Sequence, residues 1–286
     1  MKIGKSNILK VIKLAPPGAY LDGGIDQDGE PIEILLPSGE VPAETKEGDD
    51  LTTFIYFDSS DRLIASTKNG LSSVGSFTVL KVKSIERVGA FLEWGLSKDL
   101  FLPFAEQTRD LSVGMELVVY TYLDNTSRIA ASMRIERNAV KEEIPYPIGQ
   151  SVDLLIFGKT DLGYKAIIDD KYIGMIFNNE VFQEIKYGQK IEGFLKNVRE
   201  DGKVDLSLHK TGHQGAEGID AKILDLLNSN QGFLAITDKT NPDEIYRLFA
   251  VSKKKFKIAL GGLYKKRQIQ IKDDGIYLLK NRPTDL

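Results

Sequence analysis

Few side chains in this sequence are of the types that perform catalysis. The 286 residues include no cysteine and two histidines, which excludes disulfides, thiolate metal sites and a cysteine nucleophile. His209 and His213 lack the intervening glutamate of a zinc-protease motif, and no Walker or dinucleotide glycine pattern occurs. Acidic pairs such as Asp169-Asp170 are typical of turns. We therefore expect no enzyme, cofactor or metal site, although carboxylates distant in sequence could still meet in space as a nuclease site.

The side chains that could bind a ligand are mainly basic. Residues 214–286 hold 13 lysines and arginines against nine acidic residues, whereas the whole chain has a net charge of −3. No acidic residue lies between Glu244 and Asp273. That stretch includes Lys253, Lys254, Lys255, Lys257, Lys265, Lys266, Arg267 and Lys272. Such a run is either a solvated helix face or the electrostatic footprint of a protein that binds a phosphate backbone. Because no acidic residue interrupts the run, we expect it to bind nucleic acid.

Composition limits the class of protein further. Hydrophobic residues make up 42% of the chain, which suits a folded protein. No apolar run approaches the roughly 20 residues that a membrane helix needs. The first residues show no signal-peptide pattern. We expect a cytoplasmic protein with no membrane partner.

The elements that must position these side chains begin with a threefold repeat in the first 210 residues. Each copy has a glycine-centred turn, at residues 17–21, 88–92 and 162–166. Each copy ends with a hairpin of β-branched and aromatic residues, at 54–66, 118–132 and 193–207. Five short strands in about 65–70 residues fit a closed OB-type barrel, which hides its strand edges. We expect barrels at 1–68, 70–140 and 146–210, with joins near 68–70, 144–147 and 210–215.

The pattern becomes helical after residue 215. Apolar residues at helical spacing begin at Ile219, Asn241 and Pro242 form a second helix start, and Ser252 caps a third helix that carries the lysines. We expect Gly261-Gly262 to end or bend this helix, because glycine costs about 1 kcal/mol in a helix interior. A hairpin at 268–279 completes a winged helix-turn-helix at 215–286, with the lysine-rich helix in the recognition position. The predicted fold class is a multidomain, mainly β protein with three tandem five-stranded barrels before a winged helix.

The second repeat resembles a known domain. Its turn Val88-Gly89-Ala90-Phe91-Leu92, with Asp124 and Arg128 in the closing hairpin, is similar to the RNA-binding OB domain of ribosomal protein S1. Three such repeats before a winged helix resemble the bacterial conserved virulence factor B family, over essentially the whole chain. The resemblance implies an RNA-binding, regulatory protein without known catalysis.

The resemblance also implies which residues contact RNA. The aromatic position after the turn glycine is held by Tyr20, Phe91 and Lys165. The basic position of the closing hairpin is held by Arg62, Arg128 and Lys203. The histidine position of the third strand is held by Pro37, Pro103 and Phe177. Every repeat therefore keeps only part of the pattern. Lys165, Phe177 and Lys203 could form a patch in the third repeat, although Asp169, Asp170 and Asp205 are close in sequence.

Aromatic and basic residues together suit single strands, because bases stack on aromatic faces for about 1–3 kcal/mol each while cations contact phosphates. Phe91 and Arg128 could supply both on one barrel face. Trp94, by contrast, is expected to be a packing residue whose N–H is hydrogen-bonded.

Three functional hypotheses follow. The first is an RNA-binding post-transcriptional or translational regulator, in which weak contacts to single-stranded RNA add together across the domains. In the second, the acidic first repeat and the basic C-terminal domain bind proteins or each other as a scaffold. In the third, the winged helix binds duplex DNA through the lysine-rich helix and the chain acts in transcription.

Overall fold

The structure, a computed structural model, describes residues 1–68, 72–178, 181, 184–208, 214–249 and 251–279. His209, His213 and parts of the expected joins at 68–70 and 210–215 lie outside the described residues. The chain divides into two units, Met1–Val140 and Lys141–Leu286, and each is described by itself.

The first barrel is built from strands whose apolar residues alternate. Its strands are β1 (Ser6–Ala15), β2 (Gly18–Ile25), β3 (Pro31–Pro37), β4 (Asp50–Phe57) and β5 (Leu63–Ser66). In β3, Ile34 and Leu36 point into the core while Glu33 is exposed, which is the period of a strand with one buried face. The strands close in the order β1-β2-β3-β5-β4, and the only parallel pairing in this barrel joins β3 to β5.

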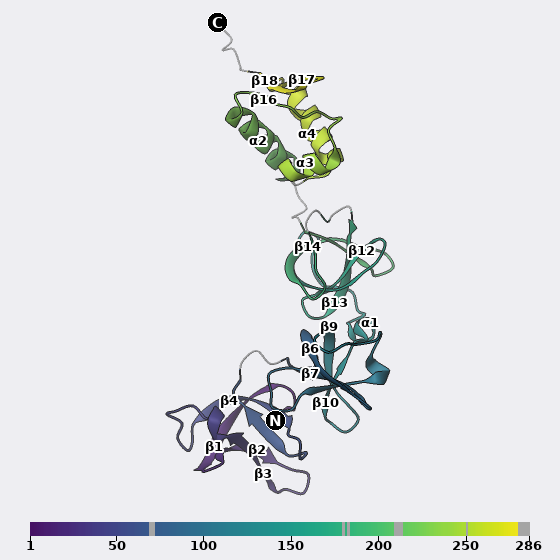
Figure 1. Ribbon diagram of the computed structural model, residues 1–286. Helices are drawn as coiled ribbons and strands as arrows, with labels where there is room; N and C mark the ends of the chain where they lie inside the picture. The colour runs from purple at the N-terminus through teal and green to yellow at the C-terminus, as the bar shows by residue number, and fades with distance from the viewer. Residues whose placement is uncertain (69–71, 179–180, 182–183, 209–213, 250, 280–286) are drawn as a thin grey trace. The chain divides into compact units, whose positions relative to one another are not determined.

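The second and third barrels repeat this topology (Figure 1). The second contains β6 (Phe77–Glu86), β7 (Gly89–Glu93), β8 (Leu100–Pro103), β9 (Glu116–Leu123) and β10 (Ile129–Ser132), followed by a short helix α1 (Ile135–Asn138). The third contains β11 (Ser151–Lys159), β12 (Gly163–Ile168), β13 (Tyr172–Phe177), β14 (Lys190–Val198) and β15 (Val204–Ser207). In both, the third strand again pairs in parallel with the fifth. The predicted fold of three five-stranded barrels is confirmed.

The turn glycine of each repeat is required by a close approach between strands. A Cβ atom at Gly18, Gly89 or Gly163 would lie 1.9, 2.5 or 2.1 Å from the carbonyl oxygen of Leu36, Leu102 or Ile176, respectively. Contacts this short do not occur for real side chains, so only glycine allows β2, β7 and β12 to lie this close to the next strand, with which each pairs in antiparallel register. The glycine-centred turns seen in the sequence therefore mark the start of the second strand of each barrel.

A partly buried glutamate ties the last strand of each of the first two barrels. Glu40 ends a 3₁₀ turn, η1 (Ser38–Glu40), and accepts a 2.5 Å hydrogen bond from the Ser66 hydroxyl. Glu106 ends the matching turn, η2 (Phe104–Glu106), and accepts from Ser132 at the same distance. These contacts join residues 26 positions apart, and no local sequence signal indicated them.

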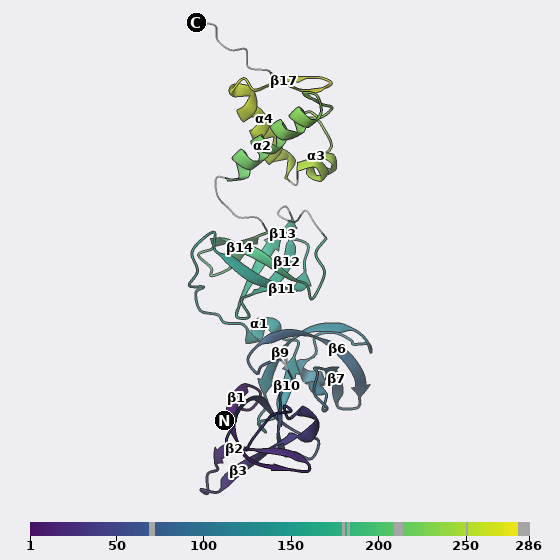
Figure 2. The same ribbon diagram turned by 90° about the vertical axis from the view of Figure 1, so that its left-hand side faces the viewer.

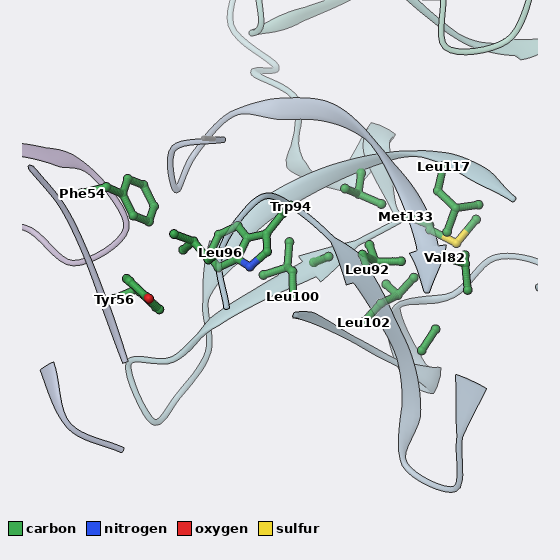
Figure 3. Close-up of a cluster of buried hydrophobic side chains, with 13 residues drawn as sticks. Phe54, Tyr56, Val82, Leu92, Trp94, Leu96, Leu100, Leu102, Leu117 and Met133 are labelled. Atoms are coloured by element: carbon green, nitrogen blue, oxygen red, sulfur yellow. The ribbon is translucent and has the colours of Figure 1, made fainter. Parts of the chain in front are cut away.

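The hydrophobic core of the second barrel extends to side chains of the first barrel, which also has a core of its own. Phe54 and Tyr56 of β4 pack with Trp94 and Leu96, which follow β7 (Figure 3). The Phe54 and Trp94 rings meet edge to face, with centroids 5.9 Å apart. Trp94 is 8% exposed, and its indole N–H donates to the Lys98 carbonyl at 2.6 Å. The predicted packing role of Trp94 is confirmed, and the two barrels form one packed unit.

The C-terminal domain is a winged helix (Figure 2). Its helices are α2 (Gln214–Ser229), α3 (Pro242–Phe249) and α4 (Lys253–Lys265). Its strands β16 (Phe233–Leu234), β17 (Ile269–Lys272) and β18 (Gly275–Leu278) form a sheet in the order β16-β18-β17. The predicted start of α3 at Pro242 and the cap of α4 are confirmed, since the Ser252 hydroxyl accepts from the Lys255 N–H. Strand β16 was not predicted.

The expectation for Gly261-Gly262 is wrong in one respect, because these glycines do not end α4. The helix continues to Lys265. Leu260 and Leu263, on either side of the glycines, are buried in the core of the domain with Phe256. Tertiary packing of this apolar face outweighs the local glycine penalty. In the described part of the chain, no helix is long and apolar enough to span a membrane.

Gly18→Ala tests the close approach of β2 and β3. The added methyl group would meet the Leu36 carbonyl, and we expect the free energy of unfolding to fall by about 1–3 kcal/mol. Gly39→Ala is the matched control in the same barrel, because a Cβ there has nothing within 4 Å. Denaturant titrations followed by Trp94 fluorescence measure both. Equal losses in the two variants would contradict the steric explanation.

Acid should weaken the tie at Glu106. Burial alone would raise the pKa of Glu106, but hydrogen bonds from Arg137 and Ser132 outweigh it and lower the pKa overall. The stabilisation is therefore complete above the ordinary carboxyl pKa of about 4.3 and is lost as the pH falls through the lower folded-state value. We expect Glu106→Gln to be less stable than the native chain at pH 7, with a difference that shrinks between about pH 5 and pH 3. Urea titrations across this range measure it, and a constant difference would refute the linkage.

Candidate nucleic-acid interface

An aromatic pair lies on the outer face of the second barrel. Phe91 on β7 and Phe101 on β8 are register partners, with ring centroids 5.4 Å apart and planes tilted by 40°. Both side chains are partly exposed. They line a pocket of about 400 Å³ to which Arg128 also contributes. The two residues that the sequence suggested for stacking and phosphate contact therefore line the same pocket.

The first barrel supplies another wall of this pocket. Tyr56 and Phe57 at the end of β4 line it, as do Trp94 and Lys98 from the segment after β7. The Tyr56 hydroxyl lies 3.3 Å from the Ser97 hydroxyl, and Lys98 Nζ donates to the Asp58 carbonyl at 2.8 Å. These contacts fix the two barrels to each other at the pocket.

The closing hairpin of the second barrel is organised by Asp124. Its carboxylate accepts from the Thr126 N–H and hydroxyl and from the Arg128 N–H. Burial would raise the pKa of Asp124, but these hydrogen bonds lower it overall. The guanidinium of Arg128 reaches the first barrel, where Nη2 lies 2.6 Å from Oδ2 of Asp61. Sequence reasoning missed Asp61 because it is 67 residues away from Arg128.

In the first barrel, the corresponding residues bind to their own neighbours. Tyr20 on β2 carries the ammonium of Lys13 over its ring, 4.5 Å from the centroid, and Lys13 pairs with Glu33 at 2.7 Å. Arg62 donates to the Asp58 carboxylate through Nε and Nη2, at 3.0 and 2.8 Å. The first barrel therefore presents a less open version of the aromatic and basic pair.

The patch expected in the third barrel is composed differently. Lys165 on β12 is the register partner of Met175, and Lys203 forms an ion pair with Asp201 in its own turn at 2.7 Å. The cation over the Phe177 ring is Arg199, 5.3 Å from the centroid. Sequence reasoning missed Arg199 because it occupies the place that an aspartate holds in the other two hairpins.

The basic run has acidic partners in the structure, although no acidic residue interrupts it in the sequence. Lys257 pairs with Asp238 at 3.3 Å, and Lys266 pairs with Asp220 at 3.4 Å. Both aspartates come from other elements, which a linear reading of the run does not include. Among the described residues of the run, the exposed cations that form no ion pair are Lys254, Lys255, Lys265, Arg267 and Lys272, and the Lys272 ammonium lies over the Tyr277 ring, 4.5 Å from its centroid.

The outward face of α4 combines cations with open space. Helical spacing aligns Lys254, Ile258, Gly261 and Lys265 on one face. Ile258 is 62% exposed, and a Cβ at Gly261 would have nothing within 4 Å. At the end of the helix, a pocket of about 480 Å³ is lined by Tyr264, Lys265, Arg267, Ile269, Gln270 and Leu279. This face can admit the backbone of a charged ligand close to the helix.

Carboxylates do not gather as a metal site in the described residues. No group of three or more His, Asp or Glu there is arranged to hold a metal ion.

Comparison with known proteins defines the class of this chain. A model of the S1 domain matches residues 3–68 and 74–134, and a model of the CvfB-like winged helix domain matches residues 221–278. The chain is thus a protein of S1-type barrels followed by a winged helix. Both are domain types of nucleic-acid-binding proteins, and nucleic-acid binding is the general function that this composition supports.

Relatives of known name extend over nearly the whole chain. The Bacillus subtilis (strain 168) protein YitL is 30% identical over 276 residues, which is 88% of this chain and 90% of the relative. Conserved virulence factor B of Staphylococcus epidermidis (strain ATCC 12228) is 25% identical over 97% of this chain and 95% of its own length. The chain belongs to the conserved virulence factor B family.

One solved structure is similar over most of both chains. It is a multidomain protein with nucleic acid binding domains from Streptococcus pneumoniae, 23% identical, covering 97% of this chain and 98% of its own, with a TM-score of 0.42.

Proposed function

We propose that this protein binds single-stranded RNA and acts as a post-transcriptional or translational regulator. The observation that carries the proposal is the partly exposed pair Phe91 and Phe101 beside Arg128 on one barrel face. Unpaired bases offer flat faces that stack on aromatic rings, whereas bases inside a duplex are already stacked on each other. An aromatic pair next to a cation therefore suits a single strand.

Other domains add weaker contacts of the same kind. Arg199 over Phe177 offers a ring and a cation in the third barrel, and the unpaired cations of α4 offer phosphate contacts in the winged helix. Contacts on linked domains add through effective concentration when one strand reaches them all. The protein can thus hold RNA firmly even though each domain binds weakly.

Duplex DNA is the second candidate ligand, and the outward face of α4 favours it. Lys254, Ile258 and Lys265 lie on the third helix of a winged helix, which is the helix that enters the major groove in this class of domain.

Fluorescence anisotropy with labelled oligo-U, oligo-A and duplex DNA, at low and physiological salt, tests the proposal. We expect the RNA oligomers to bind and to weaken with salt, and duplex DNA to compete poorly. Preference for the duplex would favour a transcriptional role through α4. If none of the three binds at low salt, the proposal is wrong, and a scaffold that binds proteins becomes the better hypothesis.

Removing one ring of the aromatic pair should weaken RNA binding. Stacking of one base is worth about 1–3 kcal/mol, so we expect Phe91→Ala to lower the affinity for oligo-U roughly five- to a hundredfold. Phe104→Ala is the matched control, because Phe104 is 52% exposed in the same barrel but does not line the pocket. Anisotropy titrations measure both, and equal affinities would remove the pocket from the binding surface.

The unpaired lysines of α4 should dominate the salt dependence of that domain. Each phosphate neutralised on a single strand contributes about 0.7 to the slope of log affinity against log salt. We expect Lys254→Ala with Lys265→Ala to lower this slope by up to about 1.4. The control replaces Lys257 and Lys266, which are already paired with Asp238 and Asp220. A larger change of this slope in the control than in the Lys254→Ala, Lys265→Ala variant would contradict the assignment of the phosphate contacts to Lys254 and Lys265.

A further inference from the structure

One residue of the first barrel occupies an unusual turn position. Asp61 has a φ of +57°, in the left-handed region that favours glycine. The same position of the closing hairpin is held by Ser127 in the second barrel and by Gly202 in the third, also at positive φ. An aspartate tolerates this conformation better than most residues, but the turn itself does not require a carboxylate.

The Asp61 carboxylate instead contacts cations of the second barrel. Its Oδ2 lies 2.6 Å from Nη2 of Arg128, and its Oδ1 lies 3.8 Å from Nζ of Lys98. Arg128 and Lys98 both line the pocket between the two barrels. One carboxylate of the first barrel therefore neutralises two cations that face this pocket.

The carboxylates that line the pocket itself are already engaged. Asp99 forms an ion pair with Lys83 at 2.9 Å. Asp124 accepts from Thr126 and from the Arg128 backbone N–H within its own turn. Asp61, which does not itself line the pocket, is thus the acidic group paired with the guanidinium of Arg128.

The apolar walls of the pocket suit a planar ring. Phe91 and Phe101 form one side, and Phe57 of the first barrel is partly exposed on another. The volume of about 400 Å³ is within the range of about 300–1,000 Å³ that small-molecule sites occupy. A flat apolar surface with a guanidinium beside it has the chemistry to bind a nucleotide: a base on the rings and a phosphate on the arginine.

We propose that the pocket between the first and second barrels binds a single nucleotide of the RNA, whose phosphate displaces Asp61 from Arg128. The proposal rests on the RNA-binding function proposed above and adds a role for the first barrel. That barrel supplies a wall of the site and also the carboxylate that competes with the ligand. Because the phosphate must replace the Asp61 carboxylate on Arg128, the affinity of the pocket for a nucleotide stays low. That affinity also depends on the strength of the ion pair between Asp61 and Arg128.

Removal of the competing charge should tighten binding. An exposed ion pair is worth up to about 1 kcal/mol, so we expect Asp61→Asn to raise the affinity for oligo-U about two- to fivefold. Asp28→Asn is the matched control, because it removes the same charge from an exposed loop of the same barrel. Asp61→Gly introduces the residue type that the third barrel has at this position, and glycine suits the left-handed turn. This variant should give the same gain in affinity, and it replaces Asp61→Asn as the test if the asparagine disturbs folding. In the Arg128→Ala background, Asp61→Asn should give no gain.

Occupation of the pocket has its own signal. Trp94 is the single tryptophan of the chain and lines this pocket, so its fluorescence should change when oligo-U or uridine 5′-monophosphate binds. Equal affinities of Asp61→Asn and Asp28→Asn, or RNA binding by anisotropy without a change at Trp94, would overturn the nucleotide site and leave RNA binding intact. Absence of RNA binding by anisotropy would overturn both proposals.

Discussion

The edge-to-face contact of Phe54 with Trp94 joins two barrels that each close on their own strands. Trp94 also donates its N–H to the Lys98 carbonyl, which holds the segment after β7 against the end of β4. Because of this packing, the hairpins that carry Asp61 and Arg128 lie within hydrogen-bond distance. The pocket therefore depends on a core contact as much as on the residues that line it. Two repeats that resemble independent modules in sequence work as a single structural unit.

The basic hairpin residue of each barrel holds a carboxylate in the structure: Arg62 pairs with Asp58, Arg128 with Asp61 and Lys203 with Asp201. Ion pairs at exposed positions are worth about 0–1 kcal/mol, so exchanging the carboxylate for a phosphate costs little. Such pairs do not remove a cation from the binding surface. The ion pairs lower the affinity of the cation for phosphate alone. They therefore favour ligands that also stack a base on an aromatic ring. Arg128 meets that condition because it lines one pocket with Phe91 and Phe101, whereas the Tyr20 ring already has Lys13 over it and Arg62 is held by Asp58.

Features that depend on neighbours in sequence could be predicted, and those that depend on distant segments could not. The closing hairpins and the Ser252 cap follow from local stereochemistry. The turn glycines could be recognised by residue type, although the close approach that requires them comes from the next strand. The partner of Arg128, the acidic residues near α4 and the place of Arg199 follow from barrel closure and from packing between elements. Local propensity alone also misleads at Gly261-Gly262, because the burial of neighbouring leucines keeps α4 helical where the two glycines would favour its end.

In the function proposed above, the pocket and the outward face of α4 select ligands through different physical interactions. Stacking in the pocket acts at short range and depends little on salt, and it requires a base that is free to leave its neighbours. The lysines of α4 act over about a Debye length, weaken steeply with salt and accept any phosphate backbone. Gly261 lies on that face, and a Cβ there would have nothing within 4 Å. A nucleic-acid backbone can therefore approach the helix whatever its bases are. A ligand that satisfies both surfaces must have accessible bases as well as phosphates, and single-stranded RNA has both.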